Sequence, residues 1–224
     1  MITSRDNERL KLLRKLHERS WRDKLGLFTV EGEDLVEAGL NAGLEPRDVL
    51  VADEDVDAAL LAEVSTLAHP PRVVGVFKRD DLPRGLRSVT LALWHVADPG
   101  NVGTLLRAAD AFGAGVALSQ GCADPNGPKA VRASMGALFR VPLSGFDEPP
   151  GRRIALVASG GVPLPELAVD GDAVLVLAAE RDGLPPEVLD RCAERVSIPQ
   201  PGGGESLNVA AAGAIALYEL ARRS

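Results

Sequence analysis

Ile198-Pro199-Gln200-Pro201-Gly202-Gly203-Gly204-Glu205-Ser206-Leu207-Asn208 joins the end of a predicted strand to a long predicted helix. That helix, expected over 206–222, is apolar almost all round, so it should be buried. Glycines let the backbone of a loop approach a ligand closely, and the first N–H groups of a helix are available to bind one. We therefore expect Ser206 and Asn208 to face a bound ligand.

The chain upstream of this segment alternates apolar runs with helical patterns. Strands are predicted at 89–96, 115–118, 153–158, 172–178 and 195–198. Helices are predicted between them at 103–112, 128–137 and 185–194. The strands lack polar alternation, which is typical of strands covered on both faces. Residues 85–224 are therefore predicted to form an α/β domain with a parallel sheet, where ligands bind at the carboxyl ends of the strands.

Residues 1–84 are predicted to form a second, smaller α/β domain that ends at the linker Pro83-Arg84-Gly85. Its predicted helices are 5–19, 33–43 and 57–68, and its predicted strands are 27–30, 49–51 and 73–77. The first 24 residues carry eight basic and four acidic side chains, which makes a local basic face. By itself this face is best interpreted as a solvated helix surface, and its role depends on what the larger domain binds.

Composition indicates an ordinary soluble globular protein of 224 residues, 46% hydrophobic and 25% charged. The net charge of −7 speaks against a general nucleic-acid binder. The sequence shows neither an apolar run long enough for a membrane span nor a signal-peptide core, so we expect a cytoplasmic protein. Cys122 and Cys192 lie far apart without metal-type spacing, so neither a metal site nor a disulfide is expected.

Two further polar loops follow predicted strands of the larger domain. The first, 98–107, opens a helix whose free N–H groups suit an anion, and the Arg107 guanidinium can grip a phosphate there. An alternative is about equally consistent with the sequence: Asn101 caps the helix and Arg107 pairs with Asp110. The second loop is 178–184, where Glu180 either orients a hydroxyl or amine or caps the next helix.

The first loop is not a common nucleotide-binding motif. It lacks the second and third glycines of the dinucleotide-binding fingerprint, and no acidic residue follows at the required spacing. The Gly-rich motif of P-loop nucleotidases is absent from the sequence as well.

Together, the three loops resemble the signature motifs of the SpoU (TrmH-like) RNA ribose 2′-O-methyltransferases of the SPOUT superfamily. The matching residues are Asn101-x-Gly103-x-x-x-Arg107-x-Ala109, Glu180-x-x-Gly183-Leu184 and Ile198-Pro199…Gly202…Ser206-Leu207-Asn208-Val209. Leu217-Tyr218-Glu219 also matches, and the segments Ile2-Thr3-Ser4 and Phe28-Thr29-Val30-Glu31-Gly32 are similar to that family's substrate-binding domain. The resemblance covers almost the whole chain.

This resemblance implies a homodimer with a deep trefoil knot in the C-terminal domain, S-adenosylmethionine as cofactor and RNA as substrate. It places cofactor contacts at Leu177, Ala178, Gly183, Ile198, Gln200, Leu207 and Asn208. It implies catalytic roles for Asn101, Arg107, Glu180, Ser206 and Asn208. The basic N-terminal face then becomes a contact for the RNA backbone, with Arg5, Arg9, Lys11, Arg14 and Arg22 as candidates.

The chemistry of each residue type refines these implied roles. Because an arginine stays protonated, we expect Arg107 to hold the adjacent phosphate and lower the pKa of the ribose hydroxyl rather than to act as a base. Asn101 and Asn208 are expected to fix geometry, Glu180 to orient Arg107 or Asn101, and Ser206 to contact the substrate or support its loop.

Three positions depart from the family pattern. Ala178 stands where the family usually has glycine, and we expect its methyl group to reduce cofactor affinity. Gln200 replaces the usual methionine, and Ala210 replaces a common serine or threonine. None of these changes removes a presumed catalytic group.

Several functions stay open at this point. The accessory domain favours ribosomal RNA over transfer RNA as the substrate. A non-catalytic RNA-binding or assembly protein that keeps the fold is the alternative from another class, supported by Ala178 and the acidic net charge. The missing fingerprints weigh against a nucleotide-binding α/β protein of other chemistry.

Overall fold

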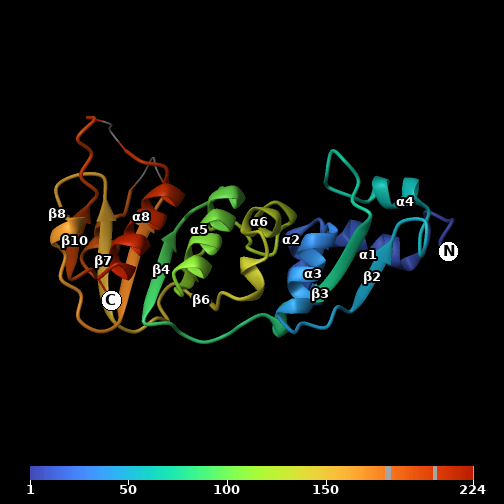
Figure 1. Cartoon of the computed structure of the whole chain (residues 1–224), viewed down its shortest axis with the longest axis horizontal. Coiled ribbons are helices and arrows are strands. Elements are labelled where there is room, and N and C mark those ends of the chain that lie inside the picture. The colour runs from blue at the N-terminus through green and yellow to red at the C-terminus, as the bar shows by residue number, and fades with distance from the viewer. Residues whose placement is uncertain (180–182, 204–205, 224) are drawn as a thin grey trace.

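A computed structural model describes residues 1–179, 183–203 and 206–223. The chain forms two α/β units that lie side by side along its long axis (Figure 1). The N-terminal unit is built on a three-stranded sheet and the C-terminal unit on a seven-stranded sheet. Within the described residues, no helix combines the length and the apolarity needed to cross a membrane.

The N-terminal sheet is antiparallel, with the strand order β1-β3-β2. Its strands are β1 (Leu27–Glu31), β2 (Asp48–Val51) and β3 (Val73–Lys78). The helices of this unit are α1 (Glu8–Leu16), α2 (Arg19–Leu25), α3 (Glu33–Asn41) and α4 (Ala58–Glu63), and the 3₁₀ turn η1 (Arg79–Asp81) follows β3. The leucines of α1 and α4 pack together in one buried cluster with residues of the sheet.

The predicted helix 5–19 corresponds to α1 (Glu8–Leu16), whereas the second helix, α2 (Arg19–Leu25), was not predicted. Glu18 has extended backbone angles (φ −90°, ψ 134°), which breaks the helix between α1 and α2. Gly26 then ends α2 in the left-handed region at φ 64°, where a residue without Cβ is least strained. The break turns α2 toward the C-terminal unit, where Arg22 makes its contacts.

The C-terminal sheet has the strand order β6-β5-β4-β9-β7-β10-β8, and all its pairs are parallel. Its strands are β4 (Val89–Trp94), β5 (Gly115–Leu118), β6 (Leu143–Gly145), β7 (Arg152–Val157), β8 (Val162–Pro163), β9 (Ala173–Ala178) and β10 (Glu194–Ser197). The predicted parallel α/β sheet is therefore confirmed. The short edge strands β6 and β8 were not predicted, and the knot stays a prediction that comes from the family resemblance.

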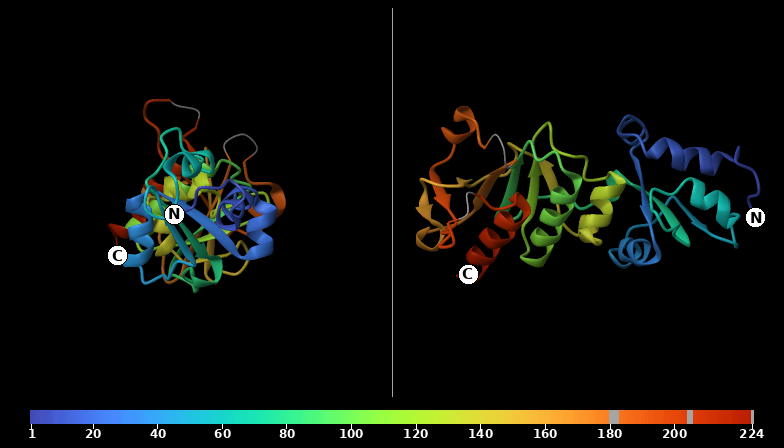
Figure 2. Two further views of the ribbon diagram at one scale, coloured as in Figure 1. Left: turned by 90° about the vertical axis from the view of Figure 1, so that its right-hand side faces the viewer. Right: turned by 90° about the horizontal axis from the view of Figure 1, so that it is seen from above.

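Helices cover both faces of this sheet (Figure 2). On one face lie α5 (Pro99–Ala111) and α8 (Val209–Ala221), and on the other lies the short α7 (Pro186–Leu189). The remaining elements are α6 (Pro128–Ser134), η2 (Ala137–Phe139) and η3 (Leu164–Glu166). A Cβ on Gly213 of α8 would lie 2.4 Å from Leu105 Cδ2 of α5, so this glycine permits the close packing of the two helices.

One hydrophobic cluster contains residues of both units. Phe28 and Phe77 of the N-terminal sheet stack around Phe139 of η2, with ring centroids 5.5–6.3 Å apart. All three belong to the same buried cluster as the residues beneath α5 and α8.

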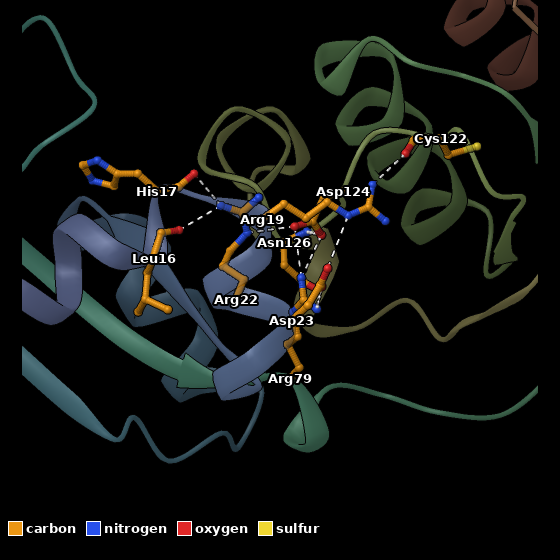
Figure 3. A network of polar contacts seen from close by, with 9 residues as sticks. All are labelled: Leu16, His17, Arg19, Arg22, Asp23, Arg79, Cys122, Asp124 and Asn126. Atoms are coloured by element: carbon orange, nitrogen blue, oxygen red, sulfur yellow. Dashed lines mark hydrogen bonds and ion pairs between the residues drawn. The ribbon is translucent and has the colours of Figure 1, made fainter.

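A polar network lies at the same junction (Figure 3). Asp124 of the C-terminal unit accepts from Arg22 Nε at 2.8 Å and from Arg79 Nη2 at 3.0 Å. The other Arg79 Nη bonds Asp23 at 2.5 Å. The two units are therefore joined by this polar network and by packed aromatic rings, as well as by the linker.

Candidate active site

A cavity of about 160 Å³ opens at the carboxyl ends of β7, β9 and β10. Its lining is mostly aliphatic and carries no charged side chain among the described residues. The two loops predicted at 178–184 and 198–208 supply most of the wall, as expected for a parallel sheet whose ligands bind beyond its strand ends.

Six of the seven predicted cofactor residues line this cavity: Leu177, Ala178, Gly183, Ile198, Gln200 and Leu207. Asn208 is not part of the lining, although its neighbours Leu207 and Val209 are. Ser206, which was predicted as catalytic, lines the cavity as well. The placement agrees with a shared binding site, and the individual contacts stay predictions.

Sequence reasoning missed part of the wall. The additional lining residues are Leu156, Val157, Ala158, Ala179, Leu184, Val209 and Ala212. The segment 156–158 ends a predicted strand, and that position was the signal that could have found it, because all parallel strands end at the same edge.

Asn101 and Asn208 connect the first and third motifs directly. Asn208 Nδ2 donates to Asn101 Oδ1 at 3.1 Å across 107 positions of sequence. The Asn208 Oδ1 atom caps α8, since it accepts from the N–H groups of Ala210 at 3.0 Å and Ala211 at 3.3 Å. Its side chain is thus fixed at both ends, and it holds Asn101 next to the loop that lines the cavity.

Asp98, rather than Asn101, caps α5. Its carboxylate accepts from the Asn101 N–H at 2.9 Å, and Lys129 Nζ lies 3.1 Å from it. The backbone hydrogen bond from Asn101, followed by the hydrogen bond from Lys129, lowers the pKa of Asp98 below its ordinary value. The alternative in which Asn101 serves only as a cap is therefore wrong, and its side chain is available for the site.

Arg107 is exposed and makes no hydrogen bond or ion pair with any residue that the structure describes. The predicted alternative partner, Asp110, is bound by Arg140 instead, with Nη2 and Oδ2 2.6 Å apart. The alternative in which Arg107 pairs with Asp110 is therefore wrong. Arg107 lies on α5, the helix that the first motif opens. Its guanidinium has five donors that no described residue engages, so it is suited to bind an anionic group.

Gly103 of the first motif serves packing rather than ligand approach. A Cβ there would lie 2.5 Å from Ala133 Cβ and 2.6 Å from the Ala130 carbonyl oxygen of α6. The glycine therefore lets α5 and α6 meet closely. Glu180, the predicted orienting carboxylate, lies outside the described residues.

Comparison with known proteins identifies the family. The profile of the SpoU rRNA Methylase family matches residues 88–218, and that of the MRM3-like substrate binding domain matches residues 7–78. The chain belongs to the SpoU rRNA methylase family.

Individual SpoU relatives are similar along almost their full length. RlmP of Bacillus subtilis (strain 168), a 23S rRNA (guanosine(2553)-2'-O)-methyltransferase, is 30% identical, with 98% of each chain covered. A TrmH-family structure from Porphyromonas gingivalis is 33% identical, with a TM-score of 0.85 and 100% of both chains covered. The AdoMet-bound rRNA methyltransferase from Sinorhizobium meliloti is 29% identical, with a TM-score of 0.86 and coverage of 99% of this chain and 97% of that one.

Several basic side chains on the N-terminal face of this SpoU protein form ion pairs within the chain. Arg5 pairs with Glu63, Arg9 binds Asp48 and the Val49 carbonyl, and Lys11 lies 3.1 Å from Glu8. The Arg14 guanidinium donates to the Arg5 carbonyl at 2.9 Å. The Asp48 carboxylate hydrogen bond raises the pKa of Arg9 above its ordinary value.

The prediction that Arg22 contacts the RNA backbone is wrong. The residue is only 4% exposed, and besides Asp124 it bonds the carbonyl oxygens of Leu16 at 2.8 Å and His17 at 2.7 Å. A guanidinium whose donors are occupied inside the protein cannot contact an RNA backbone. We therefore remove Arg22 from the predicted RNA face of the SpoU protein and assign it to the junction between its two units.

Proposed function

We propose that this SpoU protein is an S-adenosylmethionine-dependent methyltransferase that modifies a ribose 2′-hydroxyl of ribosomal RNA. The observation that carries the proposal is the hydrogen bond between Asn208 Nδ2 and Asn101 Oδ1. It joins the first and third motifs beside the cavity. Full-length similarity to a ribosomal RNA 2′-O-methyltransferase supports the choice of substrate.

The cavity fits the proposed cofactor. Aliphatic side chains such as Leu177, Ile198 and Leu207 provide walls for an adenine ring, and Gln200 and Ser206 add polar groups. The lining carries no described cation that would repel a sulfonium. When bound, S-adenosylmethionine supplies an activated methyl group, and the protein must align the hydroxyl with it and exclude water.

Arg107 is proposed to hold the phosphate next to the reacting ribose. In the reaction, the bond between the 2′-oxygen and the methyl carbon would form as the bond from that carbon to the sulfonium sulfur breaks, which would leave a neutral thioether. The hydroxyl proton would pass to water, so negative charge develops on the 2′-oxygen as the proton leaves. A protonated guanidinium nearby stabilises this charge and lowers the pKa of the hydroxyl. Asn101 and Asn208 keep the substrate aligned through the hydrogen bonds that their fixed side chains offer.

We expect Arg107→Lys to lower turnover about 100-fold, because an ammonium cannot reproduce the planar, bidentate contact that sets the geometry. The assay uses labelled S-adenosylmethionine with large-subunit ribosomal RNA, assembled subunits and transfer RNA, followed by mapping of the blocked 2′ positions. Near-wild-type turnover of the lysine variant would contradict the bidentate role. Methylation of transfer RNA alone would contradict the proposal that ribosomal RNA is the substrate. If the protein bound the cofactor but methylated none of these RNAs, the proposal that it is an RNA methyltransferase would be contradicted.

A different part of the N-terminal unit is proposed to bind the RNA. Lys15 and Lys24 each place Nζ 4.9 Å from the centroid of the half-buried Trp21 ring. Neither lysine forms an ion pair with a described residue, in contrast to Arg5 and Arg9. An aromatic ring next to free cations offers both base stacking and phosphate contact, which is how proteins bind unpaired RNA.

Replacing Trp21 by alanine is expected to weaken RNA binding about tenfold, because one base–aromatic stack is lost. Fluorescence anisotropy with a ribosomal RNA fragment measures this effect, and Trp21→Phe serves as the control that keeps a ring. Lys15→Ala should instead reduce the slope of affinity against salt concentration. Equal affinity of the alanine and phenylalanine variants would argue against stacking on Trp21.

The protein is also proposed to form a homodimer through α8. This helix leaves Ile215 40% and Tyr218 57% exposed, and Tyr218 packs edge-on against the exposed Phe112, which directly follows α5. Neighbouring exposed apolar side chains of this kind mark an interaction surface. Light scattering should give twice the chain mass of 23.5 kDa, and a monomeric mass at working concentrations would contradict the dimer.

A further inference from the structure

Asp124 fixes the N-terminal unit to the C-terminal unit through directional bonds. Its carboxylate accepts from Arg22 Nε of α2 at 2.8 Å and from Arg79 Nη2 of η1 at 3.0 Å (Figure 3). The Asp124 and Arg22 side chains are only 8% and 5% exposed. One buried carboxylate of the larger unit is therefore shared by two guanidinium groups of the smaller unit.

Stability alone does not explain a buried ion pair of this kind. Taking two charges out of water costs about as much as their attraction returns, and apolar side chains of similar volume often give an equally stable protein. What the ion pair adds is direction, because its hydrogen bonds form only in one relative orientation of the partners. The hydrophobic effect, which holds the phenylalanine rings at the same junction, is not directional. The Asp124 cluster is thus suited to fix the angle and the spacing between the two units.

On the side of the smaller unit, Arg22 fixes the helix break that carries the proposed RNA contacts. Its Nη1 donates to two carbonyl oxygens at the end of α1, at 2.8 Å and 2.7 Å. Trp21 directly precedes Arg22 on α2, and Lys15 lies in the last turn of α1. The proposed stacking ring and its neighbouring cation are therefore positioned by the guanidinium that Asp124 holds.

On the side of the larger unit, Asp124 lies just before α6, which packs on the helix of the first motif. The Asp124 carboxylate accepts from the Asn126 N–H at 2.9 Å, and the Asp124 carbonyl accepts from the Gly127 N–H at 3.0 Å. This turn leads directly into α6. A Cβ on Gly103 of α5 would lie 2.6 Å from a backbone carbonyl oxygen of α6, so the two helices touch along their backbones. A continuous series of packed elements thus connects Asp124 to the first motif.

We propose that Asp124 is a positioning residue that determines which ribose of the bound RNA is methylated. The inference rests on the proposed function, because it takes the RNA contact at Trp21 and the methyl transfer beside Asn101 from there. Every nucleotide of an RNA strand carries the same 2′-hydroxyl, so the choice among neighbouring riboses depends on the register in which the protein holds the strand. Trp21 holds the strand at one point, and the Asp124 cluster sets how far that point lies from the active site.

Asp124→Asn tests this role on the full chain, because it keeps the shape of the side chain and removes the charge that both guanidinium groups share. The variant and the wild type are incubated with S-adenosylmethionine and the RNA that the wild type methylates, and the blocked 2′ positions are mapped. We expect the wild type to modify one ribose and the variant to modify neighbouring riboses as well, with the ratio of main to adjacent sites lowered at least tenfold. The rise in melting temperature that the cofactor causes should not change.

Two further variants separate positioning from stability. Phe146→Ala removes a buried ring within the C-terminal unit and should lower stability while the mapped site stays the same. In the double variant Arg22→Met with Asp124→Leu, apolar side chains replace the ion pair, so the chain should fold even where Asp124→Asn does not. This double variant should still modify neighbouring riboses, because the directional bonds are gone.

Hydroxyl-radical footprinting on a large-subunit ribosomal RNA fragment gives a second readout that does not depend on methyl transfer. The wild type should protect one register of the strand, and Asp124→Asn and the double variant should protect several.

Three results would overturn the inference. They are an unchanged methylation map and footprint in folded Asp124→Asn, wild-type selectivity in the double variant, and relaxed selectivity in Phe146→Ala, which would assign the effect to lost stability. A wild type that methylates no RNA, together with a footprint that still shifts in Asp124→Asn, would instead count against the proposed function.

Discussion

Ala178 puts a methyl group on the wall of the cavity at the carboxyl end of β9, where the family usually has glycine. We expect Ala178→Gly to bind S-adenosylmethionine several-fold more tightly, because the methyl no longer crowds the ligand. The same change should lower stability by about 0.5–1 kcal/mol, since glycine loses more backbone freedom on folding. Calorimetric titration and thermal melting measure the two effects separately.

Ala179→Gly is the matched control for this prediction, because Ala179 lines the same cavity but is not the family's glycine position. It should lose stability in the same way without a gain in affinity. Unchanged or weaker cofactor binding by Ala178→Gly would show that the methyl group is accommodated without cost.

At the residue scale, sequence reasoning predicted residues that line one cavity, but not how they are held. Motif spacing was enough to place six predicted cofactor residues around one cavity. It could not decide between a cap and a site residue at Asn101, because that choice depends on Asp98 and on Asn208, which is 107 positions away. Arg22 shows the opposite failure: a basic residue in a basic segment turned out to be buried against Asp124.

At the element scale, the end of α8 is fixed by an ionic cluster. Glu219 accepts from Arg222 Nε at 2.6 Å and Nη2 at 2.7 Å and also binds Arg223, which donates to the Leu164 carbonyl of η3 at 3.1 Å. The hydrogen bonds from Arg222 lower the pKa of Glu219 from 4.5 to about 2. Between these two values the native state binds fewer protons than the unfolded state, so acidification destabilises the protein there.

The stabilisation from Glu219 should therefore be fully present above about pH 4.5 and lost as the pH falls through 2. We expect Glu219→Gln to flatten this part of the stability profile, measured by urea unfolding at a series of pH values. Glu37→Gln, an exposed position on α3, is the control and should follow the wild type. A glutamine variant with the same acid dependence as the wild type would assign the loss to other carboxylates.

Element prediction was accurate where a segment is long and periodic and poor where tertiary contacts decide. The central strands and the buried final helix were found from their apolar runs. Strand β6 has only three residues, and its identity as a strand comes from pairing with β5 rather than from its own pattern. Likewise, no local signal marks where α1 stops and α2 starts, since Glu18 is compatible with a helix.

At the scale of the whole molecule, the chain has two units, and one of its hydrophobic clusters runs through both. The linker at 83–85 suggested separate domains, and composition could not show that Phe28, Phe77 and Phe139 would meet. Such contacts join residues far apart in the sequence, and Phe28 and Phe139 are 111 positions apart, which periodicity does not reveal. The shared core also keeps the N-terminal unit in a fixed position relative to the active site, which is useful if both units hold one RNA.

Phe139→Ala tests whether the two units unfold together. Removing this fully packed ring should lower the free energy of unfolding by about 3–5 kcal/mol and separate the unfolding of the two units, because Phe139 is the contact that their cores share. Thermal unfolding measured by calorimetry and urea unfolding measured by circular dichroism should each show one transition for the wild type and two for the variant. Phe146→Ala removes a buried ring within the C-terminal unit alone and should destabilise without splitting the transition. A single transition in Phe139→Ala would mean that the Arg22–Asp124 network is sufficient to couple the units.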